Sequence, residues 1–198
     1  MSFYVFARGV VNLVSKLMYK VRYEGVEHVP EKGFVLCSNH ISQFDPIFVA
    51  VKVKPQCFFM AKEELFRFKP LALLLRALGA FPVARGKGDT GAIEKAVNLV
   101  RSGSVVAIFP EGHRSKTGEL QKLKSGAVLI AAETGCGLQP CVIKKGKRKF
   151  IRRPVVVRYG TFITPEQLAI QNRAPSEIRA ANRLLTGTLQ NLLEEAHV

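Results

Sequence analysis

The sequence predicts an α/β fold: a single domain with a largely parallel, mixed sheet flanked by helices and a short amphipathic N-terminal helix. Short apolar runs rich in β-formers alternate with segments whose apolar residues recur at helical spacing, the usual order in a sheet with crossover helices. The 198 residues suffice for one domain with its own core. No internal repeat or low-complexity tract interrupts the pattern.

Residues 1–20 are predicted to form an amphipathic helix in a membrane interface, and residues 21–198 to form the domain. The apolar stretch from Phe3 to Tyr19 is shorter than the ~20 residues that span a bilayer. It also lacks the basic leader and cleavage site of a signal peptide. Its polar residues recur at helical spacing, so we expect Arg8 and Lys16 to reach lipid head groups beside a broad apolar face. The alternative is a helix packed on the domain's own core.

The remaining elements follow from local patterns. Runs of apolar β-formers bounded by turn residues predict strands at 34–37, 56–60, 104–109, 138–143 and 154–159. Apolar periodicity, with proline at the start or glycine after the end, predicts helices from Pro46, from Pro70, over 90–101, over 125–134 and from Pro175. In the last helix the side chains expected inside are Ile178, Ala181, Leu185, Leu189 and Leu192. The segment 65–78 is expected to be helical core; an apolar ligand groove or a second membrane contact is the alternative.

The loop after the first of these strands carries His40 and Asp45, five positions apart. Side chains at this spacing diverge on a continuous helix, so contact between them requires a curled backbone. Histidine moves protons near neutral pH, and a nearby carboxylate fixes its tautomer. The pair is therefore a candidate acid–base site. Alternatively, Asp45 is an N-cap for the helix that starts at Pro46, or one carboxylate oxygen serves each purpose.

A second polar cluster follows the strand predicted at 104–109. Glu111, Gly112, His113 and Arg114 lie after Pro110, in a turn at the strand's carboxyl end, where open α/β sheets bind ligands. Arg114 offers a planar fork suited to a phosphate, and Glu111 is placed to orient that arginine or to bond a ligand hydroxyl. The alternative is a turn with a surface ion pair.

Taken in order, these segments resemble the sequence blocks of the glycerolipid acyltransferases. Asn39 to Asp45 is similar to their N-H-x-x-x-x-D block. Phe109 to Ser115 is similar to their F-P-E-G-T-R-S block, with His113 where threonine is usual. Further similar segments are 62–66 with 78–85, 122–127 and 139–143. The chain most resembles the 1-acyl-sn-glycerol-3-phosphate acyltransferase group of this family.

The resemblance implies acyl transfer from acyl-CoA or acyl carrier protein to the sn-2 hydroxyl of 1-acyl-glycerol 3-phosphate, which forms phosphatidic acid. His40 would take the hydroxyl proton, Asp45 would hold the imidazole, and N–H groups at the Pro46 helix start would steady the oxyanion. Substrate-binding residues implied by the resemblance are Lys62, Arg85, Glu111, Gly112 and Arg114. Direct transfer is expected, because no serine or cysteine lies in a nucleophile-elbow pattern; Ser42 is a less favoured covalent nucleophile.

Two other functions stay open at this point. The acceptor can instead be glycerol 3-phosphate or another lysolipid. In a different class, the chain is a non-catalytic basic protein that binds anionic lipid. The net charge of +15, from 30 basic and 15 acidic residues, predicts an anionic partner. We expect that partner to be the cytoplasmic side of a membrane, bound without crossing it, and we expect no nucleic acid. The basic run 144–153 is either a solvated hairpin loop or a head-group contact.

The four cysteines form no C-x-x-C pair. Cys37 and Cys57 lie in apolar runs and are expected to be reduced core thiols in a reducing cytosol. His40 lies three positions after Cys37, but no second pair accompanies them. We therefore expect no metal site and no cofactor beyond the thioester co-substrate.

Overall fold

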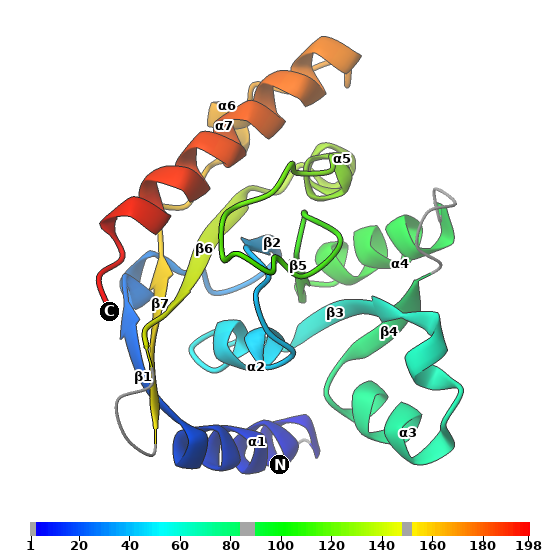
Figure 1. Ribbon diagram of the computed structural model, residues 1–198. Coiled ribbons are helices and arrows are strands. Elements are labelled where there is room, and N and C mark those ends of the chain that lie inside the picture. Colours follow the sequence, from blue (N-terminus) through cyan, green and yellow to red (C-terminus); the bar gives the residue numbers. More distant parts are fainter. Residues whose placement is uncertain (1–2, 84–89, 148–151) are drawn as a thin grey trace.

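The computed structural model describes residues 3–83, 90–147 and 152–198 of the chain. Within these residues the fold is built on one sheet of seven strands, with helices packed on both of its faces (Figure 1). The strands are β1 (Tyr19–Glu24), β2 (Phe34–Ser38), β3 (Cys57–Lys62), β4 (Ala80–Val83), β5 (Val105–Ile108), β6 (Leu138–Lys145) and β7 (Arg153–Tyr159).

The order across the sheet is β1-β7-β6-β2-β5-β3-β4, and every neighbouring pair is parallel except β6 with β7. This is the largely parallel, mixed sheet that the alternating pattern predicts. β6 and β7 form the hairpin expected around the basic run, of which residues 148–151 lie outside the described residues.

The helices are α1 (Phe3–Met18), α2 (Asp45–Ala50), α3 (Lys69–Ala77), α4 (Thr90–Arg101), α5 (Gly126–Thr134), α6 (Pro165–Leu168) and α7 (Pro175–Glu195). Short 3₁₀ turns occur at Val26–His28 and Glu63–Phe66. α4 spans the predicted range, and α7 starts at Pro175 and buries the five side chains predicted to face inward. α2, α3 and α7 each have proline at their first or second position. Proline suits these positions because an N–H there would have no intrahelical partner.

The two edge strands are absent from the sequence-based prediction. α1 ends at Met18, two residues before the predicted helix end, because Tyr19 already pairs with Arg153 of β7. At the other edge β4 contains Pro82, which is tolerated where one side of a strand has no partner. Both edge strands form by pairing with another strand of the sheet. The periodicity of a short segment does not reveal such a partner.

Alternating side chains of the central strands supply a separate core on each face of the sheet. In β2, Val35 and Cys37 pack with residues of α4, α5 and α7. Phe34 and Leu36 pack on the other face with residues of α2. All four side chains are fully buried, and burying a large apolar side chain contributes about 1.5–3 kcal/mol. These two cores hold the carboxyl end of β2, where the candidate loop begins, in place.

α1 packs on the domain through its polar side. Tyr4 and Ser15 are buried, and the backbone N–H of Cys57 donates to the Tyr4 hydroxyl over 3.1 Å. Arg8 Nη1 donates to the Val53 carbonyl over 2.8 Å. The prediction that Arg8 reaches toward lipid head groups is therefore wrong, because its guanidinium binds a carbonyl of the domain.

The opposite side of α1 is apolar and exposed. An amphipathic helix on a globular protein normally turns its apolar stripe inward, and here the direction is reversed. The exposed apolar side chains are Val5, Phe6, Val10, Leu13, Val14, Leu17 and Met18. None of the helices within the described residues is long and apolar enough to cross a bilayer.

α3 is not the core helix that its composition predicts. Ala72 is its one buried residue, whereas Leu73 and Phe68, just before the helix, are 74% and 67% exposed. Leu75 and Leu78 instead line a cavity described below. Apolar residues nearly encircle this helix. Its sequence pattern therefore does not show which side packs against the rest of the protein.

All four cysteines carry free thiols, as expected for Cys37 and Cys57. Cys37, Cys57 and Cys141 are buried, and burial raises the pKa of the Cys57 thiol to about 12. No group of three His, Cys, Asp or Glu side chains in the described ranges could hold a metal ion. The expectation of a metal-independent protein stays a prediction.

Two glycines with nearly equal backbone angles provide a test of packing around the sheet. Gly79 has φ +85° and a Cβ there would lie 2.4 Å from the Cys57 carbonyl oxygen, whereas Gly103 has φ +84° and open space. We expect Gly79→Ala to lower the free energy of unfolding by about 3 kcal/mol and Gly103→Ala by about 1 kcal/mol. Urea denaturation measures both; equal losses would show that the carbonyl contact contributes nothing.

Candidate active site

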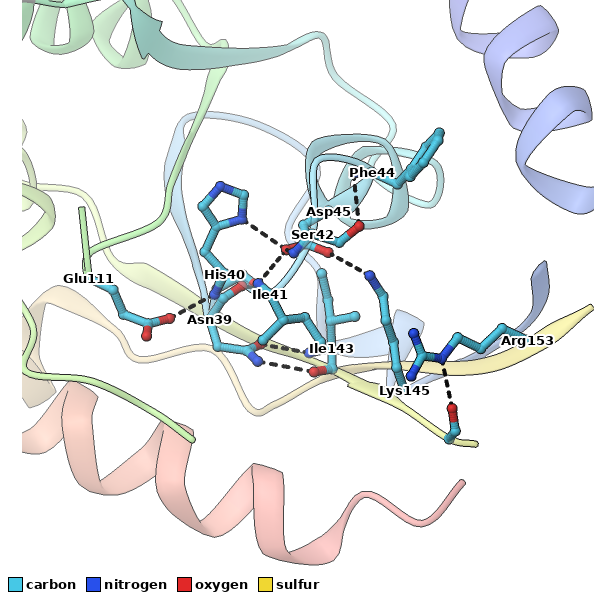
Figure 2. Close-up of polar contacts among 12 residues, drawn as sticks. Asn39, His40, Ile41, Ser42, Phe44, Asp45, Glu111, Ile143, Lys145 and Arg153 are labelled. Atoms are coloured by element: carbon cyan, nitrogen blue, oxygen red, sulfur yellow. Dashed lines mark hydrogen bonds and ion pairs between the residues drawn. The ribbon is translucent and has the colours of Figure 1, made fainter. Parts of the chain in front are cut away.

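The loop between β2 and α2 brings His40 and Asp45 into direct contact. His40 Nδ1 lies 2.8 Å from Asp45 Oδ2, and Asp45 is fully buried while the His40 side chain is 13% exposed (Figure 2). The backbone curls between them, as the spacing requires. This geometry confirms that the two side chains meet at the carboxyl end of β2.

Asp45 holds the loop together and does not cap the helix. Its Oδ2 accepts hydrogen bonds from the backbone N–H groups of Ile41 and Ser42, each over 2.6 Å. α2 begins at Asp45 itself, its N-cap residue is Phe44, and no side chain caps it. The N-cap alternative is therefore wrong: the carboxylate points back into the loop, toward the residues before it.

These bonds determine the orientation of the imidazole. An ionised carboxylate only accepts hydrogen bonds, so Nδ1 of His40 carries the proton shared with Asp45. In the neutral ring Nε2 then keeps its lone pair, available to a proton donor in the cavity that His40 lines. The ring also stacks on Phe109, with centroids 4.2 Å apart and 21° between the planes.

Asn39 ties the same loop to β6. Its Nδ2 donates to the Ile143 carbonyl over 3.0 Å, and the Ile143 N–H donates to Asn39 Oδ1 over 2.8 Å (Figure 2). A side-chain amide thus replaces one backbone step of the ladder between β2 and β6. Sequence reasoning assigned Asn39 no role, although its place directly before His40 in the motif was a signal.

Glu111 is a structural link between two loops. It is 2% exposed, and its Oε1 accepts from the His40 N–H over 2.7 Å while Oε2 accepts from the Gln121 N–H over 3.0 Å. The Ser115 N–H donates to the His40 carbonyl over 2.7 Å, which adds a second tie. No ion pair joins Glu111 to Arg114, so the expectation that Glu111 orients the arginine is wrong.

Neighbouring residues of the turn after β5 have different surroundings. Gly112 has φ +77°, and a Cβ there would lie 2.9 Å from Lys124 Nζ, so glycine shapes the turn. His113 and Arg114 are both exposed, but only Arg114 lines the cavity beside His40. The histidine at the position of the usual threonine is thus outside the lining.

A cavity of about 450 Å³ extends from His40 between α1, α2, α3 and the strands β3 and β4. This volume is typical of small-ligand sites. Its lining is mostly apolar and includes a few polar side chains. The lining residues are Tyr4, Arg8, Val11, His40, Gln43, Pro46, Ile47, Ala50, Phe59, Met60, Ala61, Lys62, Leu65, Leu75, Leu78, Ala80, Phe109 and Arg114.

The predicted phosphate-binding cations are only partly brought together. Lys62 and Arg114 line the same cavity, and Lys62 Nζ also pairs with Glu64 over 2.8 Å. Arg85 lies outside the described residues. Arg8, which sequence reasoning placed at a membrane, is a further cation of the lining.

The N–H groups at the start of α2 are not available for an oxyanion. Those of Ile41 and Ser42 donate to Asp45, and that of Phe44 donates to Ser42 Oγ over 3.3 Å. Those of Asp45 and Ile47 donate to loop carbonyls, and Pro46 has none. The expectation that this helix start steadies an oxyanion is therefore wrong, since forming the loop uses these donors.

Comparison with known proteins agrees with this site. The Acyltransferase family model matches residues 20–144, which include the His40–Asp45 loop and the turn with Glu111 and Arg114. The chain belongs to the acyltransferase family. This acyltransferase is 34% identical over 160 residues to the 1-acyl-sn-glycerol-3-phosphate acyltransferase of Bacillus subtilis, covering 75% of this chain and 79% of that protein. The resemblance drawn from the ordered motifs is thereby confirmed.

Another relative and a solved structure extend the comparison. The acyltransferase is 32% identical to the 1-acyl-sn-glycerol-3-phosphate acyltransferase of Streptococcus pneumoniae over 70% of this chain, and spans 53% of that protein. The crystal structure of the 1-acyl-sn-glycerophosphate acyltransferase of Thermotoga maritima matches with a TM-score of 0.75 at 21% identity. The match covers 98% of this chain and 80% of that one. The structural match shows that the fold is the same.

Glu111→Gln tests the link between the loops. A glutamine offers one acceptor oxygen where two backbone N–H groups need one each, so one buried N–H loses its partner. We expect the free energy of unfolding to fall by about 1–3 kcal/mol, and the amide protons of His40 and Gln121 to exchange faster with solvent. Glu119→Gln is the control, because Glu119 is exposed. Unchanged stability and exchange in Glu111→Gln would contradict this role.

Proposed function

We propose that this acyltransferase moves a fatty acyl group from an acyl-CoA or acyl carrier protein thioester to the sn-2 hydroxyl of 1-acyl-glycerol 3-phosphate. The products are phosphatidic acid and a free thiol, in phospholipid biosynthesis. The observation that carries the proposal is an oriented His40–Asp45 pair whose histidine lines a mostly apolar cavity. The named activity of the Bacillus subtilis relative supports the same acceptor.

In this mechanism His40 is the general base. Its Nε2 takes the proton of the acceptor hydroxyl as the oxygen attacks the thioester carbonyl carbon and a C–O bond forms. The C–S bond then breaks, and the leaving thiolate recovers the proton from the imidazolium. Asp45 stabilises the imidazolium while it lasts. Such proton transfer contributes about 10²–10⁴-fold to the rate.

The cavity suits a substrate with an anionic head and an apolar chain. Arg114 and Lys62 line the same cavity as His40 and would bind the acceptor phosphate, with Arg85 assigned to the same role from the family motif. Gly112 allows the positive φ of the turn that precedes Arg114. Glu111 supports the site by holding the His40 backbone. The apolar walls would receive an acyl chain, which gains about 0.8 kcal/mol for each buried methylene.

The acyltransferase is proposed to work on the cytoplasmic side of an anionic membrane. The exposed apolar side of α1 would enter the lipid interface. α3 contacts α1 and lies at the same end of the molecule (Figure 1), and its Leu73 is also exposed. The cavity lies between these two helices, so lipid substrates could enter it from the bilayer. Lys16, exposed on α1, and the net charge of +15 favour anionic head groups.

His40→Ala tests the reaction. We expect the purified parent protein to convert lysophosphatidic acid and an acyl thioester to phosphatidic acid with release of free thiol. Because the base is lost, His40→Ala should be at least about 100-fold slower. His197→Ala is the matched control, since His197 is exposed on the C-terminal segment, away from the cavity lining.

The same assay separates the alternatives. Parallel reactions with glycerol 3-phosphate and other lysolipids identify the acceptor, and acyl-CoA against acyl carrier protein identifies the donor. Turnover that survives unchanged in folded His40→Ala would refute the His40–Asp45 mechanism. An absence of turnover with every acceptor and donor would favour the non-catalytic lipid-binding class.

Replacing Leu13 and Leu17 by glutamine tests the membrane contact. Both side chains are strongly exposed, at 64% and 68%, so the fold should tolerate the change. We expect partitioning onto anionic phospholipid vesicles to fall about 10-fold or more for each leucine, from the apolar area lost. Vesicle sedimentation measures this. Leu184→Gln on α7, 42% exposed, is the control; an equal effect there would refute a specific role for α1.

A further inference from the structure

Lys145, at the end of β6, approaches the Asp45 carboxylate from the side away from the His40 ring (Figure 2). Its Nζ is 3.6 Å from Asp45 Oδ1, and its side chain is only 10% exposed. The ammonium also lies over the rings of Tyr19 and Phe48, at 5.7 and 5.6 Å from their centroids. Burial lowers the pKa of Lys145, and the Asp45 carboxylate opposes this effect.

The two oxygens of Asp45 are in unequal surroundings. Oδ2 contacts three donors: His40 Nδ1 and the N–H groups of Ile41 and Ser42. Oδ1 is buried and has no hydrogen-bond partner among the described residues. A buried carboxylate oxygen without a partner is costly, and the Lys145 ammonium is the charge that faces it.

We propose that Lys145 is a positioning residue for the acyl transfer: its ammonium holds Oδ1 of Asp45, so that Oδ2 stays directed at His40, and it limits how strongly the carboxylate attracts a proton onto the imidazole. His40 then stays neutral, and able to accept the hydroxyl proton, at a lower pH than an isolated His–Asp pair would allow. The inference deepens the proposed function and rests on it for its catalytic part.

The position of Lys145 separates this role from substrate binding. Lys145 lines a second cavity, of about 590 Å³, whose lining shares no residue with that of the apolar one. It is not among the residues that line the apolar cavity beside His40. A change at Lys145 should therefore alter kcat more than the KM for the acceptor.

Other charged groups surround this pair and stay in place in the test. Those around Lys145 belong to β7, to α7 and to the loop after β5. Those around His40 belong to the cavity lining and to the turn after β5. The groups are Arg153, Lys116, Glu119 and Glu194 near Lys145, and Arg8, Lys62, Glu111 and Arg114 near His40. Lys144, the preceding residue, instead donates from Nζ to the Leu193 carbonyl over 2.9 Å. It is the matched control.

The experiment compares Lys145→Met with Lys144→Met and the parent. NMR titration of the His40 ring gives the pH midpoint at which the imidazole gains its proton. We expect this midpoint to rise by about 0.5–1 pH unit in Lys145→Met, because the carboxylate has lost its neighbouring cation. It should stay unchanged in Lys144→Met. We expect kcat for phosphatidic acid formation to fall about 10-fold, less than the ~10²–10⁴-fold contribution of proton transfer.

A second variant distinguishes the loss of the Lys145 charge from a general disturbance of the structure. In Lys145→Ala, ethylammonium ions that enter through the second cavity should restore part of the kcat and return the His40 midpoint toward the parent value. A His40 midpoint that is unchanged in folded Lys145→Met would overturn the inference, whatever its activity. A parent that titrates as expected but lacks turnover would refute the proposed function and leave the electrostatic role of Lys145 supported.

Discussion

The buried carboxylate of Asp45 is the constraint on which the rest of the site depends. One oxygen accepts from the His40 ring and from two consecutive loop N–H groups. Burying a charge without such partners would be prohibitive, so the loop can reach its folded shape only by closing around this carboxylate. The same contacts that form the loop therefore aim the imidazole. The interactions that fold the loop are thus the same ones that orient the proposed base.

The loop is in turn held from both sides of the sheet centre. Asn39 extends the pairing between β2 and β6, and Glu111 connects the His40 backbone to the segment after β5. Because β2 lies between β5 and β6 in the sheet, each neighbour contributes one anchor. Glu111 thus holds the backbone of His40, and Asn39 holds the preceding position of the loop to β6. The His40 ring lines the cavity.

The reversed polarity of α1 connects the fold to the proposed membrane role. Tyr4, Arg8 and Ser15 face the domain, and the apolar side faces outward. Packed through its polar side, α1 borders the apolar cavity that His40 lines. The same helix therefore presents an exposed apolar surface and contributes Tyr4, Arg8 and Val11 to the cavity lining.

The sequence by itself determined the α/β class, the central strands and most helices, and it singled out His40 and Asp45 as a candidate pair. These features could be predicted because apolar periodicity and turn residues reflect interactions between residues a few positions apart. Only the tertiary structure decided the edge strands, the outward side of α1, the exposure of α3 and the anchoring roles of Asn39 and Glu111. These depend on partners far along the chain: Asn39 bonds Ile143 across 104 positions. No local pattern records which buried group will meet which carboxylate, so the contact between Lys145 and Asp45 was visible only in the folded molecule.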